Sequence, residues 1–157
     1  MTDFVRATAQ KSATLKASAQ DAYALITDWG GLERWYPKES PVVIQRIELL
    51  GPPDKLPLAR VLHAADGRQV PETLLVKNDL TKRIYYSLAD GALPGIVGYV
   101  CTNTMDEVDE NTTLFTFQST FDVTDSALGA EGGRQMVEAI YTRLLGGLAA
   151  YFEHGGA

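Results

Sequence analysis

The chain contains very little cysteine and no long apolar run. Cys101 is the only cysteine among 157 residues, so the chain cannot form an internal disulfide and its core must hold the fold together. No apolar stretch approaches the ~20 residues that a membrane-spanning helix requires. The first residues also lack the basic and then apolar pattern of a signal peptide. We therefore expect a cytoplasmic protein without membrane insertion.

Basic clusters and metal-ligand patterns are also missing. The chain has 14 Lys and Arg against 20 Asp and Glu, a formal charge of −6, and no basic run that would neutralise phosphates, so we expect no nucleic-acid partner. Its two histidines, His63 and His154, have no ligand neighbour at a spacing typical of metal sites. No glycine-rich phosphate loop is present. The sequence therefore predicts neither a metal nor another cofactor.

What the chain does contain is an ordinary globular composition. Hydrophobic residues make up 45% and charged residues 22% of the chain, which is typical of a folded domain. A length of 157 residues suits one domain with a sizeable core. We expect residues 1–157 to form a single domain.

The first third of the chain predicts one strand and two short helices. Residues 5–16 alternate loosely, which indicates a strand. Ser18 and Asp21 form a capping pattern, and the apolar residues that follow recur at helical spacing up to Trp29. A second short helix is expected over residues 32–36, after two glycines and before Pro37.

The middle of the chain predicts a series of strands. The dipeptide Asp66-Gly67 is a strong hairpin signal between two of them. Because no helical segment interrupts these strands, we expect one antiparallel sheet. The predicted strands are residues 40–50, 58–65, 69–77, 83–89, 96–108 and 112–123.

The last segment changes to a helical period. Apolar residues recur every three or four positions over residues 131–153, a helix ~34 Å long at 1.5 Å per residue. That length suffices to cross a sheet. The predicted sheet-facing residues are Ile140, Tyr141, Leu144 and Leu148.

The order and spacing of several short motifs resemble one superfamily. The matching segments are residues 18–29, Trp35-Tyr36-Pro37, Arg60 with Gly67, residues 70–74 with Asp79, residues 85–88, Leu93-Pro94, Tyr99 and Phe121-Asp122. Together they resemble the polyketide cyclase/dehydrase-like branch of the START/Bet v 1-like (SRPBCC) superfamily, with plant abscisic-acid receptors as distant relatives. The resemblance implies an α+β helix-grip fold. In that fold a curved antiparallel sheet of six to seven strands, two short helices and a long C-terminal helix enclose a cavity.

Glu72 is the leading candidate for chemistry in that cavity. It lies on a predicted strand beside Leu74, at the position where the receptor relatives carry a pocket glutamate. A carboxylate among apolar groups would have a raised pKa and could act as a general acid or base. The alternative is a glutamate that only supports the structure or orients a ligand.

The other predicted ligand contacts come from the strands and the last helix. Strand parity places Tyr86 with Leu88, and Tyr99 with Cys101. Inward tyrosines offer hydroxyls at a cavity wall, although they could equally be core residues. The full predicted ligand-binding set is Glu72, Leu74, Tyr86, Leu88, Tyr99, Cys101, Gln118, Tyr141 and Leu144.

Two arguments conflict at Gln118. Alternation along residues 115–121 would bury the phenylalanines and expose Gln118. The resemblance instead points Gln118 into the cavity, where many relatives carry a tryptophan, and a bulge could reverse the parity. We follow the resemblance and predict an inward Gln118.

The sequence leaves three functions open. The first is binding or carrying a small hydrophobic molecule, and the second is a polyketide or aromatic cyclase or dehydrase that uses Glu72. The third is a stress or interaction protein with no dedicated ligand. Binding is the leading hypothesis because only one strong proton donor or acceptor is predicted inside. An oligomer is compatible with the sequence.

Overall fold

The computed structural model describes residues 3–155. Its element order is the one that the sequence predicts. The elements are β1 (Val5–Leu15), α1 (Ala19–Thr27), the 3-10 turn η1 (Leu32–Arg34), β2 (Ile44–Leu50), β3 (Leu58–Ala64), β4 (Gln69–Asn78), β5 (Arg83–Leu88), β6 (Ile96–Asp109), β7 (Thr112–Val123) and α2 (Gly129–Glu153).

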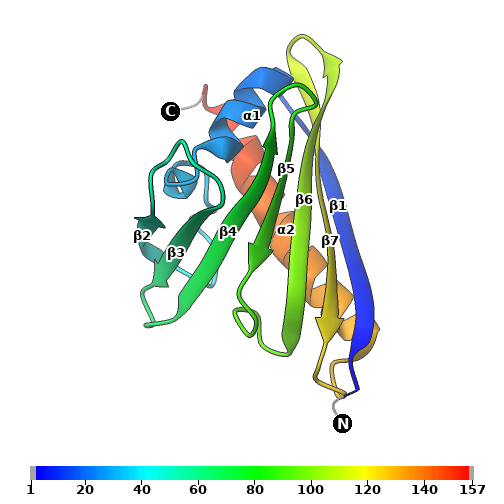
Figure 1. Ribbon diagram of the computed structural model, residues 1–157. Coiled ribbons are helices and arrows are strands. Elements are labelled where there is room, and N and C mark those ends of the chain that lie inside the picture. Colours follow the sequence, from blue (N-terminus) through cyan, green and yellow to red (C-terminus); the bar gives the residue numbers. More distant parts are fainter. Residues whose placement is uncertain (1–2, 156–157) are drawn as a thin grey trace.

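The strands form one antiparallel sheet in which the first and the last strand of the chain are neighbours. The strand order is β1-β7-β6-β5-β4-β3-β2, so β1 pairs with the last strand while the remaining neighbours are successive in sequence. Each pair is antiparallel, as expected when no helix connects the strands. The sheet is curved, and Figure 1 shows α2 running along one of its faces. The predicted helix-grip fold is confirmed.

Helix α2 packs its apolar stripe against the inner face of the sheet. The buried stripe includes Val137, Tyr141, Leu145 and Leu148, and the ring of Tyr141 stacks on Phe117 of β7 with centroids 4.9 Å apart. This spacing of four, four and three residues is that of one helix face.

The four residues predicted for the inward face of α2 all face the sheet, but they differ in burial. Tyr141 and Leu148 are buried, but Ile140 and Leu144 are only half-buried. Both line a cavity between helix and sheet. They therefore do face the sheet, but across a cavity instead of against packed neighbours.

Strand β7 alternates without interruption, which corrects the prediction for Gln118. Phe117 and Ser119 are buried while Gln118 between them is exposed. The pairing of β7 with β1 runs from Val123 to Thr113 in one register, and the irregularities of the β6–β7 pair lie outside the Gln118 region. Because no bulge reverses the parity there, Gln118 lies on the outer face of the sheet.

The predicted short helices are both present. The Ser18 hydroxyl accepts a hydrogen bond of 3.0 Å from the Asp21 amide and so caps α1. The second is one 3-10 turn that ends before Trp35. Within residues 3–155, no helix combines the length and apolarity needed to span a bilayer.

Candidate functional site

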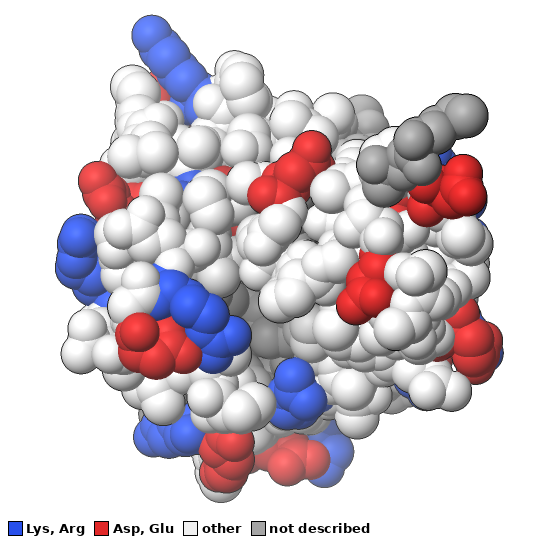
Figure 2. All heavy atoms as spheres, turned by 90° about the horizontal axis from the view of Figure 1, so that it is seen from below, with Lys and Arg blue, Asp and Glu red and all other residues white. Residues whose placement is uncertain are grey.

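A cavity of about 390 Å³ lies between the sheet, α2 and the segment that follows α1. It reaches the surface at the end of the molecule formed by the β3–β4 turn and the β5–β6 loop, because Arg68, Leu93 and Pro94 are among the lining residues. Figure 2 looks onto this end and shows a hollow near its centre, with Lys and Arg side chains beside it. The apolar part of the wall includes Ile26, Trp29, Leu32, Trp35, Leu62, Val70, Leu88, Phe117, Met136 and Leu144.

Most of the predicted contact residues lie on this wall. The lining residues among them are Glu72, Tyr86, Leu88, Tyr99, Tyr141 and Leu144. The remaining three are corrected. Gln118 faces outward, while Leu74 and Cys101 are buried to 2% and 0% exposure in the core but do not reach the cavity.

Glu72 forms a buried ion pair with Arg60. The two residues face each other across the β3–β4 pair, and the Arg60 Nε donates to Glu72 Oε2 over 2.8 Å. The Arg60 Nη1 donates to the Trp29 carbonyl, also over 2.8 Å, and the guanidinium carbon lies 3.5 Å from the centre of the Trp29 ring. A hydrogen-bonded partner compensates the cost of burying a charge. The sequence predicted no ionic partner for Glu72, and the structure supplies one in Arg60.

Sequence reasoning did not assign Arg60 to the site. It appeared only as part of a spacing motif, although it lines the cavity and is 5% exposed. The Asp66-Gly67 hairpin was a signal that could have found it. This turn sets β3 against β4 and so places Arg60 beside Glu72.

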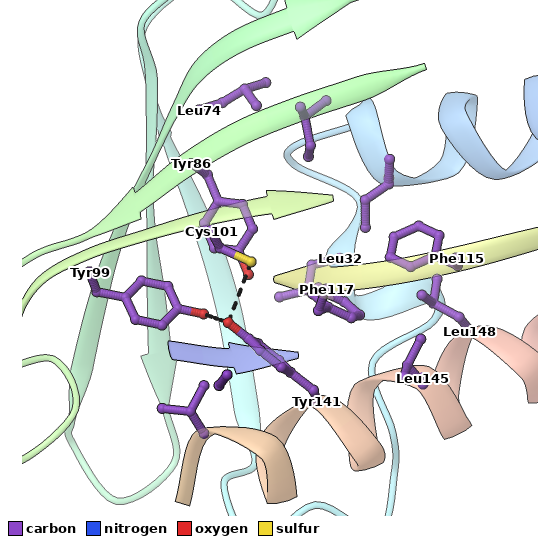
Figure 3. Packing of buried hydrophobic residues seen from close by; sticks show 14 of the residues in the cluster. Leu32, Leu74, Tyr86, Tyr99, Cys101, Phe115, Phe117, Tyr141, Leu145 and Leu148 are labelled. Atoms are coloured by element: carbon purple, nitrogen blue, oxygen red, sulfur yellow. Dashed lines mark hydrogen bonds between the residues drawn. The ribbon is translucent and has the colours of Figure 1, made fainter. Parts of the chain in front are cut away.

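Three tyrosines converge on the buried thiol of Cys101 (Figure 3). The hydroxyls of Tyr99 and Tyr141 share a hydrogen bond, and the Tyr141 hydroxyl donates to the Cys101 sulfur over 3.4 Å. The thiol in turn donates to Asn103 Oδ1, also over 3.4 Å. Tyr86 extends the cluster, with its ring between Trp29 and Tyr99 at centroid distances of 5.6 and 6.3 Å.

Burial keeps these groups protonated. Loss of solvation raises the pKa of Tyr86, Tyr99 and Tyr141 well above the ordinary phenol value of 10.0. The same cause raises the pKa of Cys101 to about 11. At neutral pH this cluster therefore supplies neutral hydrogen-bonding groups, and its thiol is not the thiolate that a nucleophile requires.

Neither histidine lines the cavity. His63 lies near the β2 edge of the sheet, where its Nε2 is 2.9 Å from Glu48 Oε2, and His154 caps the end of α2. Within residues 3–155, no three His, Cys, Asp or Glu side chains form a group that could hold a metal ion.

A comparison with known protein families matches nearly the whole chain to one family. The family described as "Polyketide cyclase / dehydrase and lipid transport" matches residues 6–153. A comparison with curated proteins found no match.

Solved structures with the same architecture come from several sources. An uncharacterised protein from Bacillus thuringiensis shares 26% identity and a TM-score of 0.76, over 93% of this chain and 98% of that chain. Norcoclaurine synthase from Thalictrum flavum, solved with a transition-state analogue, shares 13% identity and a TM-score of 0.71, over 99% of both chains. The di-domain ARO/CYC protein BexL shares 14% identity and a TM-score of 0.75, over 93% of this chain and 46% of that chain. At 13% and 14% identity, the last two similarities concern the fold alone.

Proposed function

Because the chain belongs to the polyketide cyclase/dehydrase and lipid transport family, we propose that it binds a small, mainly apolar molecule in the cavity between the sheet and α2. The observation that carries this proposal is the cavity itself. Its volume of about 390 Å³ lies in the range of small-molecule sites, roughly 300–1,000 Å³. A site of this size suits a molecule of one to three rings.

The wall supplies a few polar groups among many apolar ones. The proposed contacts are Tyr86, Leu88, Tyr99, Tyr141 and Leu144, with the Arg60–Glu72 pair as the ionic group that orients the ligand. The buried Nε1 of Trp29 has no hydrogen-bond partner within the described residues, and Trp29 lines the cavity. An acceptor atom on a ligand could accept a hydrogen bond from this N–H group. A buried donor without a partner costs free energy.

Titration with N-phenyl-1-naphthylamine, a neutral apolar fluorophore, tests the proposal. We expect saturable binding with a fluorescence increase, and native mass spectrometry of freshly purified protein should show a co-purified small molecule. Leu144→Trp should fill part of the cavity and weaken binding. Ala150→Trp is the control, because Ala150 is exposed on the same helix and does not line the cavity.

An absence of saturable binding would contradict this function and favour a protein without a dedicated ligand. The same conclusion would follow if Leu144→Trp and Ala150→Trp bound the fluorophore equally well, since the probe would then sit outside the cavity.

A second candidate is cyclase or dehydrase activity on a polyketide or aromatic substrate. The observation in its favour is that Glu72 and the clustered Tyr86, Tyr99 and Tyr141 line one cavity, so a carboxylate and neutral phenols surround the same substrate. In that function Glu72 would move the proton while the tyrosines hold a substrate carbonyl. Glu72→Gln would then abolish turnover of the substrate while leaving its binding intact. Unchanged turnover would remove Glu72 from any catalytic role.

A further inference from the structure

The cavity wall carries more positively than negatively charged side chains. Three arginines line it, Arg60, Arg68 and Arg143, against one acidic residue, Glu72. This excess of positive charge is opposite to the net charge of the chain, −6. A local field of one sign in a concave site favours a ligand of the other sign.

Two of the three arginines already have carboxylate partners. Arg60 is paired with Glu72 inside the cavity. Arg68, on the β3–β4 turn, is paired with Asp66 at an Nη2–Oδ2 distance of 2.7 Å. The charge of each is thus compensated within the chain, which leaves the third arginine as the source of the excess.

Arg143 has no such partner. Within residues 3–155 it makes neither an ion pair nor a side-chain hydrogen bond, and its side chain is exposed. It lies three residues after Ile140 and four after Ala139, and all three line the cavity. This spacing places Arg143 on the cavity-facing stripe of α2. Because it is exposed and still lines the cavity, it lies where the cavity opens to solvent.

We propose that Arg143 is an anion-binding residue at the cavity mouth, and that the ligand is an amphipathic carboxylate with its apolar body inside. This inference rests on the proposed function and specifies its ligand class. A guanidinium matches a carboxylate through two parallel hydrogen bonds. The deeper wall offers mainly apolar groups and the Glu72 carboxylate, so an anionic group would lose solvation there without gaining a cation that is not already paired. The mouth is therefore the position at which the ligand keeps its charge.

The test compares 1-naphthaleneacetic acid with 1-naphthaleneacetamide by isothermal titration calorimetry. The two probes have nearly the same shape and differ in charge. We expect the acid to bind up to about fivefold more tightly than the amide, the ratio that corresponds to ~1 kcal/mol for a solvent-exposed ionic contact. Raising the salt concentration should weaken the binding of the acid and leave the binding of the amide unchanged, because salt screens a solvent-exposed ion pair.

Arg143→Gln should remove most of the advantage of the acid and leave the affinity for the amide unchanged. Arg143→Lys, which keeps the charge, should retain part of it. The matched control is Arg134→Gln on the same helix, since Arg134 is paired with Glu131 and Glu138 and does not line the cavity. This control should bind both probes like the unmodified chain.

The outcomes separate the two proposals. Equal binding of acid and amide, or an Arg143→Gln variant that keeps the full preference for the acid, overturns the anion site while leaving cavity binding intact. Failure of both probes to bind contradicts the proposed function as well. A loss of preference in Arg134→Gln as large as in Arg143→Gln would show a general charge effect, and this too overturns the assignment.

Discussion

At the scale of single residues, the buried charges of Arg60 and Glu72 are the most constrained feature. Their side chains are 7% and 12% exposed, so each loses most of its solvation and depends on the other for compensation. Breaking such a pair from one side leaves an uncompensated charge, which costs more than the pair itself contributes. The pair therefore acts as a structural constraint on the β3–β4 hairpin as well as a polar group at the cavity.

Glu72→Gln should destabilise the protein by about 3 kcal/mol, because Arg60 keeps its charge and loses its anionic partner. Chemical denaturation measures the free energy of unfolding. Arg60→Met combined with Glu72→Leu removes both charges and should be more stable than Glu72→Gln alone. An equal or greater stability of Glu72→Gln relative to the unmodified chain would contradict the structural importance of the pair.

Two leucines on α2 distinguish core from cavity wall. Leu148 is fully buried among packed side chains, so Leu148→Ala should cost about 2–5 kcal/mol. Leu144 is half-buried and lines the cavity, so Leu144→Ala creates little new void and should cost about 1 kcal/mol. Urea denaturation of both variants measures the difference. Equal losses would show that Leu144 is a core residue, and a loss under ~0.5 kcal/mol would show a surface position.

At the scale of elements, α2 approaches the loop after η1 closely at one glycine. A Cβ atom on Gly147 would clash with the Trp35 carbonyl and come within 3.0 Å of Pro37 Cδ. The neighbouring Gly146 has nothing within 4 Å of its Cβ position. Gly147 is thus needed for the helix to lie against the loop that carries Trp35 and Tyr36 to the cavity wall.

Gly147→Ala and Gly146→Ala should therefore change stability in opposite directions. Both substitutions raise helix propensity, by ~1 kcal/mol. At Gly147 the clash with backbone atoms outweighs this gain and should lower stability by about 1–3 kcal/mol, whereas Gly146→Ala should be stabilising. Thermal denaturation followed by circular dichroism compares the two. Similar shifts in both variants would contradict the close contact between α2 and the loop.

At the scale of the whole molecule, the buried phenols and thiol make the fold sensitive to alkaline pH. Burial raises the pKa of Cys101 from 9.0 to about 11 and those of Tyr86, Tyr99 and Tyr141 above 10.0. Because the protonated forms are favoured in the folded state, their contribution to stability is fully present below the unfolded pKa values. This contribution to stability is lost as the pH rises from the pKa values of the unfolded state to those of the folded state.

Ionisation of these groups should therefore leave the melting temperature unchanged up to about pH 9 and lower it as the pH approaches 11. Circular dichroism gives the melting temperature, and absorbance near 295 nm shows when tyrosinate forms. We expect the tyrosinate signal of the three buried phenols to appear together with unfolding. Tyr99→Phe removes one ionisable group and should reduce the alkaline loss. A stable fold to pH 11, or the same alkaline loss in Tyr99→Phe, would contradict this origin.

The sequence alone determined the elements and their order. Helix periods, caps and turn residues act over a few neighbouring positions, so the cap at Ser18, the hairpin at Asp66-Gly67 and the C-terminal helix were predictable from local patterns. The antiparallel sheet followed because no helix lies between its middle strands. Alternation along β7 also predicted the outward side chain of Gln118 correctly, where the argument from resemblance was wrong.

Only the tertiary structure decided which side chains meet. The partnership of Arg60 with Glu72 depends on strand register, and the meeting of Tyr99, Tyr141 and Cys101 depends on how α2 is placed against the sheet. Whether a residue such as Leu144 or Leu74 lines the cavity or packs in the core also depends on helix placement. These contacts join residues far apart in the chain, and a shift of one residue in register would replace every partner. Local patterns carry no information on such shifts, which is why the cavity wall emerged only from the fold.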